Sequence, residues 1–376
     1  MTARSSAAVL QARTALMRSA IGLLSRFFNV LVLEAAEKCP EVTMYFEHKL
    51  NRIDFSKGSM DFLQGPEKTK VTKHADLIVG TDGAYSKVRG QMMRMTRMNY
   101  QQEYIDECYC ELHMPAKLVE GKRTYAMDPN HLHIWPRHKF LITAIPDRDH
   151  TFTCTLFMPY GMFEAIDTNE KLMEFFATYF KDIIPLIGEE TLQKDYFQNP
   201  RGSLISIKAS PHHVLAKGVL LGDSAHAMVP FYGQGLNCGL QDVQVLFKVL
   251  DEHLICSATV PYGLQQALEA YSAERVEDCH AMCDLAMYNH KELRSGVTSL
   301  SYLIRRRLER WIHQRAPQVL VPLYCMVSFS TIPYSEAIRR WRRQSIGILV
   351  VLSVLALISM VSLFWLVAQG VTTVYS

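Results

Sequence analysis

One stretch of the sequence, residues 218–249, constrains the fold more than any other part of the chain. It reads GVLLGDSAHAMVPFYGQGLNCGLQDVQVLFKV. An apolar strand, Val219–Leu221, is followed by a loop rich in glycine. A helix is expected next, because apolar residues recur at helical spacing and form one face: Leu236, Leu240, Val243, Phe247 and Leu250. Free N–H groups and the positive end of a helix dipole bind anionic or polar groups, so this order predicts an α/β unit with a cofactor site.

Two aspartates follow predicted strands. Asp223 stands directly after the strand of this stretch, where a carboxylate can accept hydrogen bonds from a sugar-like hydroxyl chain. Asp82 follows a second buried strand, predicted at 75–80, and Gly83 beside it permits a sharp turn. The alternatives are an ordinary strand-to-helix turn for the first and a plain Asp-Gly turn for the second.

Several motifs carry a resemblance to the class A flavoprotein aromatic hydroxylases. GDSAHAMVPFYGQGLNCGLQD is similar to the second FAD fingerprint of that family, and DLIVGTDGAYSKVR (76–89) resembles its DG motif, which contacts FAD and NADPH. YAMDPNHLHIWPR (125–137) and DLAMYN (284–289) resemble the branch that hydroxylates L-kynurenine. The resemblance covers roughly residues 26–343.

The resemblance implies an α/β fold, with an FAD-binding parallel sheet, an inserted antiparallel β-sheet substrate domain and a helical C-terminal region ending in a transmembrane helix. The family begins with a strand, G-x-G-x-x-G and a helix. Residues 1–60 hold no such motif, and their only glycines are Gly22 and Gly58. We therefore expect a shortened form, whose sheet lacks its first βαβ unit.

The expected divisions follow the family. They are a basic leader at 1–28, a remnant of the FAD-binding domain at 29–99, the substrate sheet at 100–205, the return to the FAD-binding domain at 206–262, a helical region at 263–345 and a membrane anchor at 346–368. Within them we expect helices at 29–39, 170–179, 189–196 and through 263–330. Strands are expected at 42–46, in a hairpin at 51–62 with its turn near Lys57, and around 132–134, 140–144 and 152–157.

The resemblance also implies site residues. The FAD contacts align with Arg26, Leu50, Asp82, Asp223, Leu236 and Asn237. The substrate contacts align with Pro230, Phe231, Asn289 and Tyr324, of which the last two would hold the amino-acid end of kynurenine. No catalytic side chain is implied, because the flavin carries the chemistry: NADPH reduces FAD, and the reduced flavin and O₂ hydroxylate the ring.

The two ends of the chain carry signals of their own. Residues 1–33 contain arginines and no acidic residue, which is typical of a mitochondrial transit peptide, of an alternative first exon or of a gene-model artefact. Ile346–Ala368 is free of charge and would span about 34 Å as a helix, enough to cross a bilayer. The basic segment 339–343 before it predicts a globular part facing the cytosol. The resemblance adds the mitochondrial outer membrane as the location.

Composition excludes some alternatives. A net charge of +3 gives no reason to expect a nucleic-acid partner, and nine cysteines at irregular spacing do not form a disulfide framework. Cys279, His280 and Cys283 could offer metal ligands on one helix, but no second ligand pair is evident, so no metal is expected.

Three functions remain open from the sequence. The first is an FAD- and NADPH-dependent monooxygenase acting on L-kynurenine. The second is a catalytically inactive, membrane-anchored shortened form. The third is another membrane flavoprotein monooxygenase of the squalene epoxidase type, against which HIWPR and DLAMYN argue.

Overall fold

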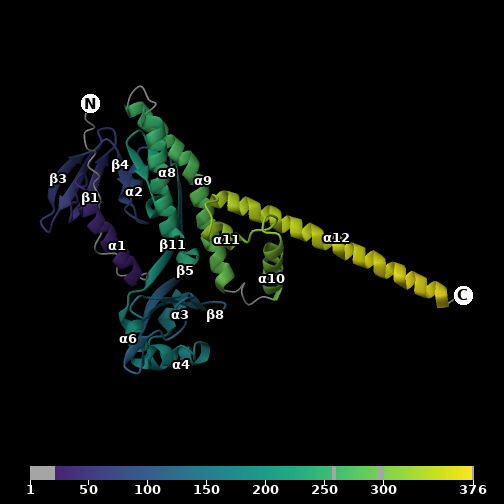
Figure 1. The fold of residues 1–376 in the computed structure, drawn as a ribbon. Helices are drawn as coiled ribbons and strands as arrows, with labels where there is room; N and C mark the ends of the chain where they lie inside the picture. The colour runs from purple at the N-terminus through teal and green to yellow at the C-terminus, as the bar shows by residue number, and fades with distance from the viewer. Residues whose placement is uncertain (1–21, 256–259, 295–299, 375–376) are drawn as a thin grey trace. The chain divides into compact units, whose positions relative to one another are not determined.

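A computed structural model describes residues 22–255, 260–294 and 300–374 (Figure 1). The expectations for residues 1–21 therefore lie outside the described residues. The chain divides into two units, residues 1–299 and residues 300–376. The first unit is mixed α/β, and the second is helical in its described part.

A small sheet in the first unit joins two segments far apart in sequence. Strand β4 (Ile78–Gly80) runs parallel to β13 (Gly218–Leu220), with Val79 opposite Val219. The two-residue strand β12 (His213–Val214) pairs antiparallel with the other side of β13. Both strands of the parallel pair are as predicted, although β4 is shorter than the expected 75–80.

An antiparallel meander precedes this sheet: β1 (His48–Asp54), β2 (Ser59–Gln64) and β3 (Thr69–His74). The predicted hairpin is therefore correct, and Gly58 occupies its turn at φ +63. The predicted strand at 42–46 is wrong. The Val42 N–H instead donates to the Cys39 carbonyl in the turn after helix α1 (Gly22–Glu37), and the strand ladder begins only at His48.

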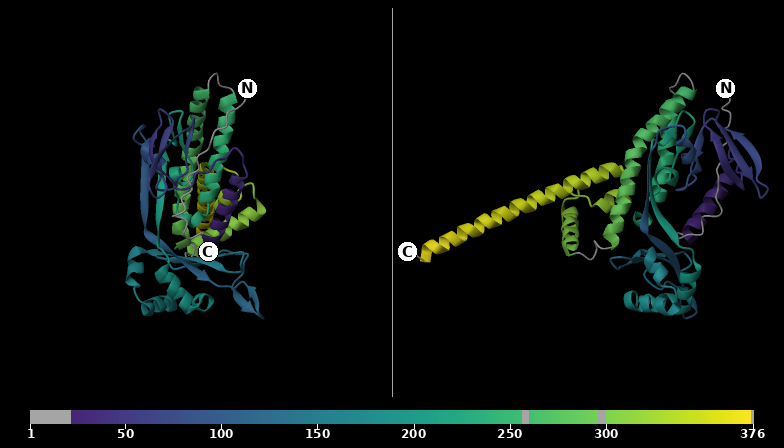
Figure 2. Two further views of the ribbon diagram at one scale, coloured as in Figure 1. Left: turned by 90° about the vertical axis from the view of Figure 1, so that its left-hand side faces the viewer. Right: turned by 180° about the vertical axis from the view of Figure 1, so that it is seen from behind.

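A larger antiparallel sheet forms the other part of the first unit, in the order β11-β5-β10-β9-β8. Its 16-residue strand β5 pairs with β11 along one edge and with β10 along the other. Figures 1 and 2 show β5 and β11 running from the region of α8 and α9 to the part covered by α4 and α6. These strands are β5 (Asn99–Met114), β8 (His133–Pro136), β9 (Leu141–Pro146), β10 (Phe152–Pro159) and β11 (Gly202–Ser210).

Helices cover this sheet and bury its largest core. Alternate residues of β5, such as Cys110 and Leu112, pack with Phe163, Phe176 and Leu192 from the helices. The helices are α3 (Tyr160–Ala165), α4 (Asn169–Tyr179), α5 (Ile184–Ile187) and α6 (Glu189–Gln198). Thr168 caps α4 by accepting a hydrogen bond from the Lys171 N–H, which fixes where that helix begins. Strands β6 (Lys117–Val119) and β7 (Lys122–Thr124) form a separate ribbon.

Two long helices pack on β13: α8 (Gly235–Ile255) and α9 (Val260–Arg294). The buried face of α8 carries Val245, Leu246 and Val249. Most of the apolar face predicted from periodicity is instead exposed, since Leu236, Leu240, Val243 and Phe247 are 41–62% accessible. Apolar spacing predicted the helix correctly, but it did not identify the face that packs.

The second unit contains α10 (Leu300–Arg315), α11 (Leu323–Ser328) and α12 (Tyr334–Val374). Helix α12 is the one helix among the described residues that is long and apolar enough to cross a membrane, over Tyr334–Ser362. The apolar part of this helix is not buried in the protein: Ile346, Leu349 and Leu357 are each more than half exposed. That exposure is unlike a core helix of a soluble protein.

Candidate functional site

The carboxyl ends of β4 and β13 lie side by side and carry the two predicted aspartates. Leu220 lies opposite Gly80 in the parallel register, so Asp82 and Asp223 both follow the same edge of the sheet. Ligands of parallel α/β sheets bind at this edge. The structure therefore brings together two motifs that are separated by about 140 residues in the sequence.

Arg89 ties the two turns to each other. Its guanidinium is buried and donates to the Ser224 carbonyl at 2.6 Å and to the Ala84 carbonyl at 2.7 Å. The Ser224 hydroxyl donates in turn to the Gly80 carbonyl at 2.6 Å. Buried polar groups that are fully hydrogen-bonded fix one geometry, so the relative position of the two turns is well determined.

Gly222 makes the turn after β13 possible. Its φ of +60 and ψ of −144 belong to a region that side chains exclude. The Gly222 N–H donates to Asp242 Oδ2 at 2.8 Å. A Cβ added to Gly239 of α8 would lie 3.6 Å from the Gly222 Cα. Helix α8 thus approaches the turn closely at Gly239 and Asp242.

Asp223 is the first residue of α7, directly after the Gly222 turn. Its side chain is accessible to solvent, yet surrounding protein atoms desolvate the carboxylate and raise its pKa. An accessible acceptor in such surroundings is suited to hydrogen-bonding a ligand hydroxyl group.

Leu236 and Asn237 lie in the first turn of α8. The helical ladder begins with the Cys238 N–H donating to the Gln234 carbonyl, so the N–H groups of residues 235–237 precede it. Both side chains are exposed, and the Asn237 amide donates to Gln234 Oε1 at 2.9 Å. The N–H groups of residues 235–237 thus lie outside the helical ladder, where a ligand could accept hydrogen bonds from them.

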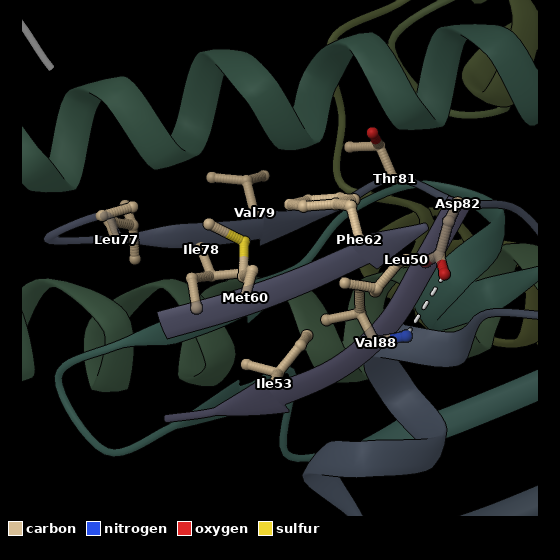
Figure 3. A pocket seen from close by; sticks show the side chains of 11 residues that line it. Leu50, Ile53, Met60, Phe62, Leu77, Ile78, Val79, Thr81, Asp82 and Val88 are labelled. Atoms are coloured by element: carbon tan, nitrogen blue, oxygen red, sulfur yellow. Dashed lines mark hydrogen bonds between the residues drawn. The ribbon is translucent and has the colours of Figure 1, made fainter. Parts of the chain in front are cut away.

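Leu50 and Asp82 line one narrow pocket, together with apolar residues of β2 and β4 (Figure 3). The Asp82 carboxylate accepts hydrogen bonds from the N–H groups of Lys87 at 2.6 Å and Val88 at 3.2 Å, so it stabilises the start of α2 (Lys87–Met92). The cavity volume of about 50 Å³ cannot hold a flavin. Leu50 and Asp82 would therefore meet a cofactor only at the rim of this pocket.

The predicted substrate residues Phe231 and Asn289 are in direct contact. The Asn289 side chain is buried, and its Nδ2 donates to the Phe231 carbonyl at 2.8 Å. Phe231 lies in a short 3-10 helix, η1 (Pro230–Tyr232), and its ring stacks on His290 with the centroids 4.3 Å apart. Pro230, beside it, is exposed.

A buried ionic cluster below Phe231 was not found from the sequence. Glu107 of β5 is 3% exposed and accepts hydrogen bonds from His290 at 2.9 Å and from Arg294. The spacing of His290 and Arg294 places both on one face of α9. Their partner lies 183 residues from His290, and no local pattern points to it.

A second buried network lies behind the Asp223 turn, in α7 (Asp223–His226), α8 and α9. Asp242 accepts from His226 Nε2 at 2.6 Å and from Arg275 Nε at 2.8 Å. Burial by itself lowers the pKa of His226, but the hydrogen bond to Asp242 outweighs burial and raises this pKa to about 10. Burial raises the pKa of Asp242, but the hydrogen bond from His226 outweighs burial and lowers this pKa to about 2. The pair is therefore charged, and it holds α8 against the turn.

For two predicted site residues the structure gives no position relative to this site. Tyr324 lies in α11 of the second unit, where it is 56% exposed and packs edge-on against Phe329. Arg26 lies in α1, and its side chain is outside the described residues. Their roles stay predictions.

Comparisons with known proteins agree with this geometry. Residues 9–286 match the family described as FAD binding domain. The fold is similar to that of 2-methyl-3-hydroxypyridine-5-carboxylic acid oxygenase, with 19% sequence identity, a TM-score of 0.52 and coverage of 74% of this chain and 69% of that chain. It is also similar to that of Klebsiella pneumoniae HpxO complexed with FAD and uric acid, with 15% identity, a TM-score of 0.52 and coverage of 77% of this chain and 66% of that chain. The chain therefore has the fold of the FAD-binding aromatic hydroxylases.

Two relatives define the family more closely. Kynurenine 3-monooxygenase of Drosophila willistoni is 42% identical over 318 residues, covering 84% of this chain and 67% of its own length. That of Sus scrofa is 40% identical over 316 residues, covering 84% and 64%. The chain belongs to the kynurenine 3-monooxygenase family and spans about two thirds of the length of these relatives.

The residues at the strand ends fit FAD. The glycine-only turn at Gly222 lets a ligand approach the backbone, Asp223 offers an accessible carboxylate, and α8 presents the N–H groups of its first turn. FAD is the cofactor of this family.

Proposed function

We propose that the chain acts in the hydroxylation of L-kynurenine to 3-hydroxykynurenine, with FAD as cofactor and NADPH and O₂ as co-substrates. The observation that carries the proposal is the meeting of the Gly222–Asp223 turn, the Asp82 turn and the start of α8 at one sheet edge, in a chain 42% identical to a kynurenine 3-monooxygenase.

Bound FAD would supply the redox chemistry of the reaction. Asp223 would accept hydrogen bonds from hydroxyl groups of the cofactor. The N-terminus of α8, with Leu236 and Asn237, would lie against the flavin and favour negative charge there through its dipole. Leu50, Asp82 and Arg26 complete the proposed cofactor contacts.

Phe231 and Asn289 would position the aromatic substrate. The hydrogen bond from Asn289 to the Phe231 carbonyl and the stacking of Phe231 on His290 support a rigid wall at this point. Pro230 lies beside that wall, and Tyr324 is proposed to contact the amino-acid end of the substrate. A rigid wall is useful because small errors in ring position cost large factors in rate.

We also propose that α12 anchors the chain in the mitochondrial outer membrane with the globular part in the cytosol. The exposed apolar helix and the arginines at 339, 340, 342 and 343 support the anchor and its orientation. The organelle follows from the family.

The proposal is tested by measuring NADPH oxidised and 3-hydroxykynurenine formed with FAD supplied. The protein is the full chain fused to the N-terminal segment of a relative, so that the whole length of the family is present. We expect product that depends on both kynurenine and FAD. Absence of product from a folded, FAD-loaded fusion would overturn the proposal.

A further inference from the structure

Basic residues are concentrated in the second unit. Residues 300–345 contain nine arginines and two glutamates, whereas the rest of the chain contains 31 basic and 35 acidic residues. The net charge of +3 for the whole chain conceals this asymmetry. A cluster of arginines on one small unit indicates an anionic partner for that unit rather than for the protein as a whole.

Exposed apolar and basic side chains share one face of α10. Ile304, Arg307 and Trp311 are spaced by three and four residues, so they lie on the same side of the helix, and Leu303 and Arg310 flank them. Ile304 is 60% exposed and Trp311 is 53% exposed, and both arginines are exposed as well. A tryptophan and aliphatic residues among arginines are typical of a helix that lies in the headgroup layer of a membrane.

The arginines of this face are not balanced by carboxylates. Glu309, the acidic residue of α10, accepts a hydrogen bond from Arg305 at 2.7 Å on the side of the helix that turns toward α12. Within the part of the chain that the structure describes, no ion pair joins a carboxylate to Arg306, Arg307 or Arg310. A helix face that only meets water ordinarily carries both signs of charge, so this face is suited to an anion from outside the protein.

Helix α10 is held beside the point where α12 becomes apolar (Figure 1). Arg305 Nη2 donates to Ser345 Oγ at 2.7 Å, and the same guanidinium lies 5.7 Å from the centre of the Trp341 ring. Ser345 directly precedes the uncharged run that begins at Ile346. These contacts keep α10 close to the level at which the proposed anchor would enter a bilayer, next to the exposed arginines at 342 and 343.

We propose that the exposed face of α10 binds anionic phospholipid headgroups of the bilayer in which α12 is anchored. The guanidinium groups would donate paired hydrogen bonds to headgroup phosphates. Ile304 and Trp311 would lie at the boundary between headgroups and acyl chains. The proposal rests on the proposed anchor and adds a lipid preference to it, and it does not depend on the proposed hydroxylase activity. The face consists of Leu303, Ile304, Arg306, Arg307, Arg310 and Trp311.

The test is arginine footprinting of the full 376-residue chain in lipid nanodiscs, with phenylglyoxal as label and mass spectrometry as readout. Discs of phosphatidylcholine alone are compared with discs that contain about 30% phosphatidylserine. We expect Arg306, Arg307 and Arg310 to be labelled at least about threefold more slowly in the anionic discs. This difference should shrink when the salt is raised from about 0.1 M to about 0.5 M. Arg123, exposed on the separate β6–β7 ribbon, should be labelled equally in both discs.

Two triple variants with the same change of charge test the face itself. One carries Arg306→Gln, Arg307→Gln and Arg310→Gln. The control makes the same change at three exposed basic residues of the β6–β7 ribbon, Lys117→Gln, Lys122→Gln and Arg123→Gln. When detergent is removed from the full chain in a mixture of phosphatidylcholine vesicles and phosphatidylserine-containing vesicles, the wild type should favour the anionic vesicles. The α10 variant should lower this preference at least about threefold, and the control should keep it.

Each outcome decides between the contact and its alternatives. Equal labelling of the α10 arginines in both discs overturns the proposal while leaving the anchor intact, and an acidic protein surface is then the partner that this face fits. Equal loss of preference in the two triple variants overturns it as well, because total charge and not α10 would then set the preference. A chain that enters neither kind of disc overturns the anchor, and this proposal with it.

Discussion

Asp223 is the residue whose side chain most directly faces the proposed cofactor. Its substitution by alanine would leave a ligand hydroxyl without its acceptor in a partly closed site, at about 1–3 kcal/mol. In the fusion described above, we expect FAD affinity to fall roughly 5- to 150-fold, measured by flavin fluorescence titration. Asp251→Ala in the last turns of α8, where the carboxylate is exposed and remote from the turn, should leave affinity unchanged. Equal affinity in Asp223→Ala and wild type would contradict the assignment.

Asn289 should act on substrate rather than on cofactor. Its amide holds the Phe231 carbonyl, so Asn289→Ala removes both a proposed contact to kynurenine and the support of the ring wall. Together with Tyr324→Phe, it should leave FAD bound, raise the Michaelis constant for kynurenine and uncouple NADPH oxidation from hydroxylation.

The measurement is paired: NADPH consumed against 3-hydroxykynurenine formed as kynurenine is titrated. Asp284→Asn serves as the control, because Asp284 is on the same helix but exposed, and it forms an ion pair with Lys208. If both substrate-site variants keep affinity and coupling, the positions were carried over wrongly from the family.

Glu111 gives a pH dependence to stability. Burial, with a smaller contribution from Asp147, raises its pKa from 4.5 to about 7. Its Oε1 is buried and has no hydrogen-bond partner among the residues that the structure describes. The native state therefore holds this proton more tightly than the unfolded chain does. The stabilisation is complete below about pH 4.5 and is lost as the pH rises through about 7.

Glu111→Gln keeps the neutral form at every pH. Its melting temperature should exceed that of the wild type at pH 8, and the difference should shrink toward pH 5. Thermal unfolding followed by circular dichroism at both pH values checks this. A difference that is constant with pH would show that Glu111 does not titrate in this range.

At the scale of elements, the sequence predicts what is local and fails where partners are distant. Helices α4 and α6, the β1–β2 hairpin and strands β9 and β10 follow from apolar periodicity and turn residues. Residues 42–46 have a strand-like composition but no ladder, and the spacing of α8 did not reveal that Val245 and Val249, not Leu240 and Phe247, face the core. Which face of α8 is buried depends on where β13 and α9 lie, and the apolar spacing within one helix carries no information about those partners.

Helix α12 carries its own prediction. Deletion of residues 346–376 removes most of the exposed apolar surface of the helix and leaves the basic segment before it. We expect the shortened protein in the soluble fraction after carbonate washing, because the loss of about twenty apolar residues removes the spanning segment. As control, replacing this segment by an unrelated apolar helix of equal length should restore pelleting. A deletion variant that remains in the membrane pellet would place the anchor elsewhere.

At the scale of the whole molecule, the site depends on contacts that join distant parts of the chain. Family motifs identified the Asp82 and Asp223 turns one by one, and the structure shows that β4, β13 and Arg89 make them neighbours. The partners that fix them were not predictable. Arg89 reaches Ser224 across 135 residues, and Glu107 reaches His290 across 183, so no local pattern contains either pair.

The 376-residue chain by itself is predicted to bind FAD weakly. In the family pattern that this chain resembles, the backbone N–H groups of a G-x-G-x-x-G turn bind the FAD pyrophosphate. Residues 1–60 hold no such motif. Each hydrogen bond is worth about 0.5–1.5 kcal/mol net. Four of them amount to roughly 2–6 kcal/mol, or about a 30- to 20,000-fold change in affinity.

The 376-residue chain by itself should therefore lose flavin on gel filtration, whereas the fusion to a relative's N-terminal segment should retain it. A fusion in which the three glycines of that motif are replaced by valine is the control and should behave like the chain alone. Stoichiometric flavin on the unfused chain, read from its absorbance after gel filtration, would show that the strand-end turns and α8 suffice to hold FAD.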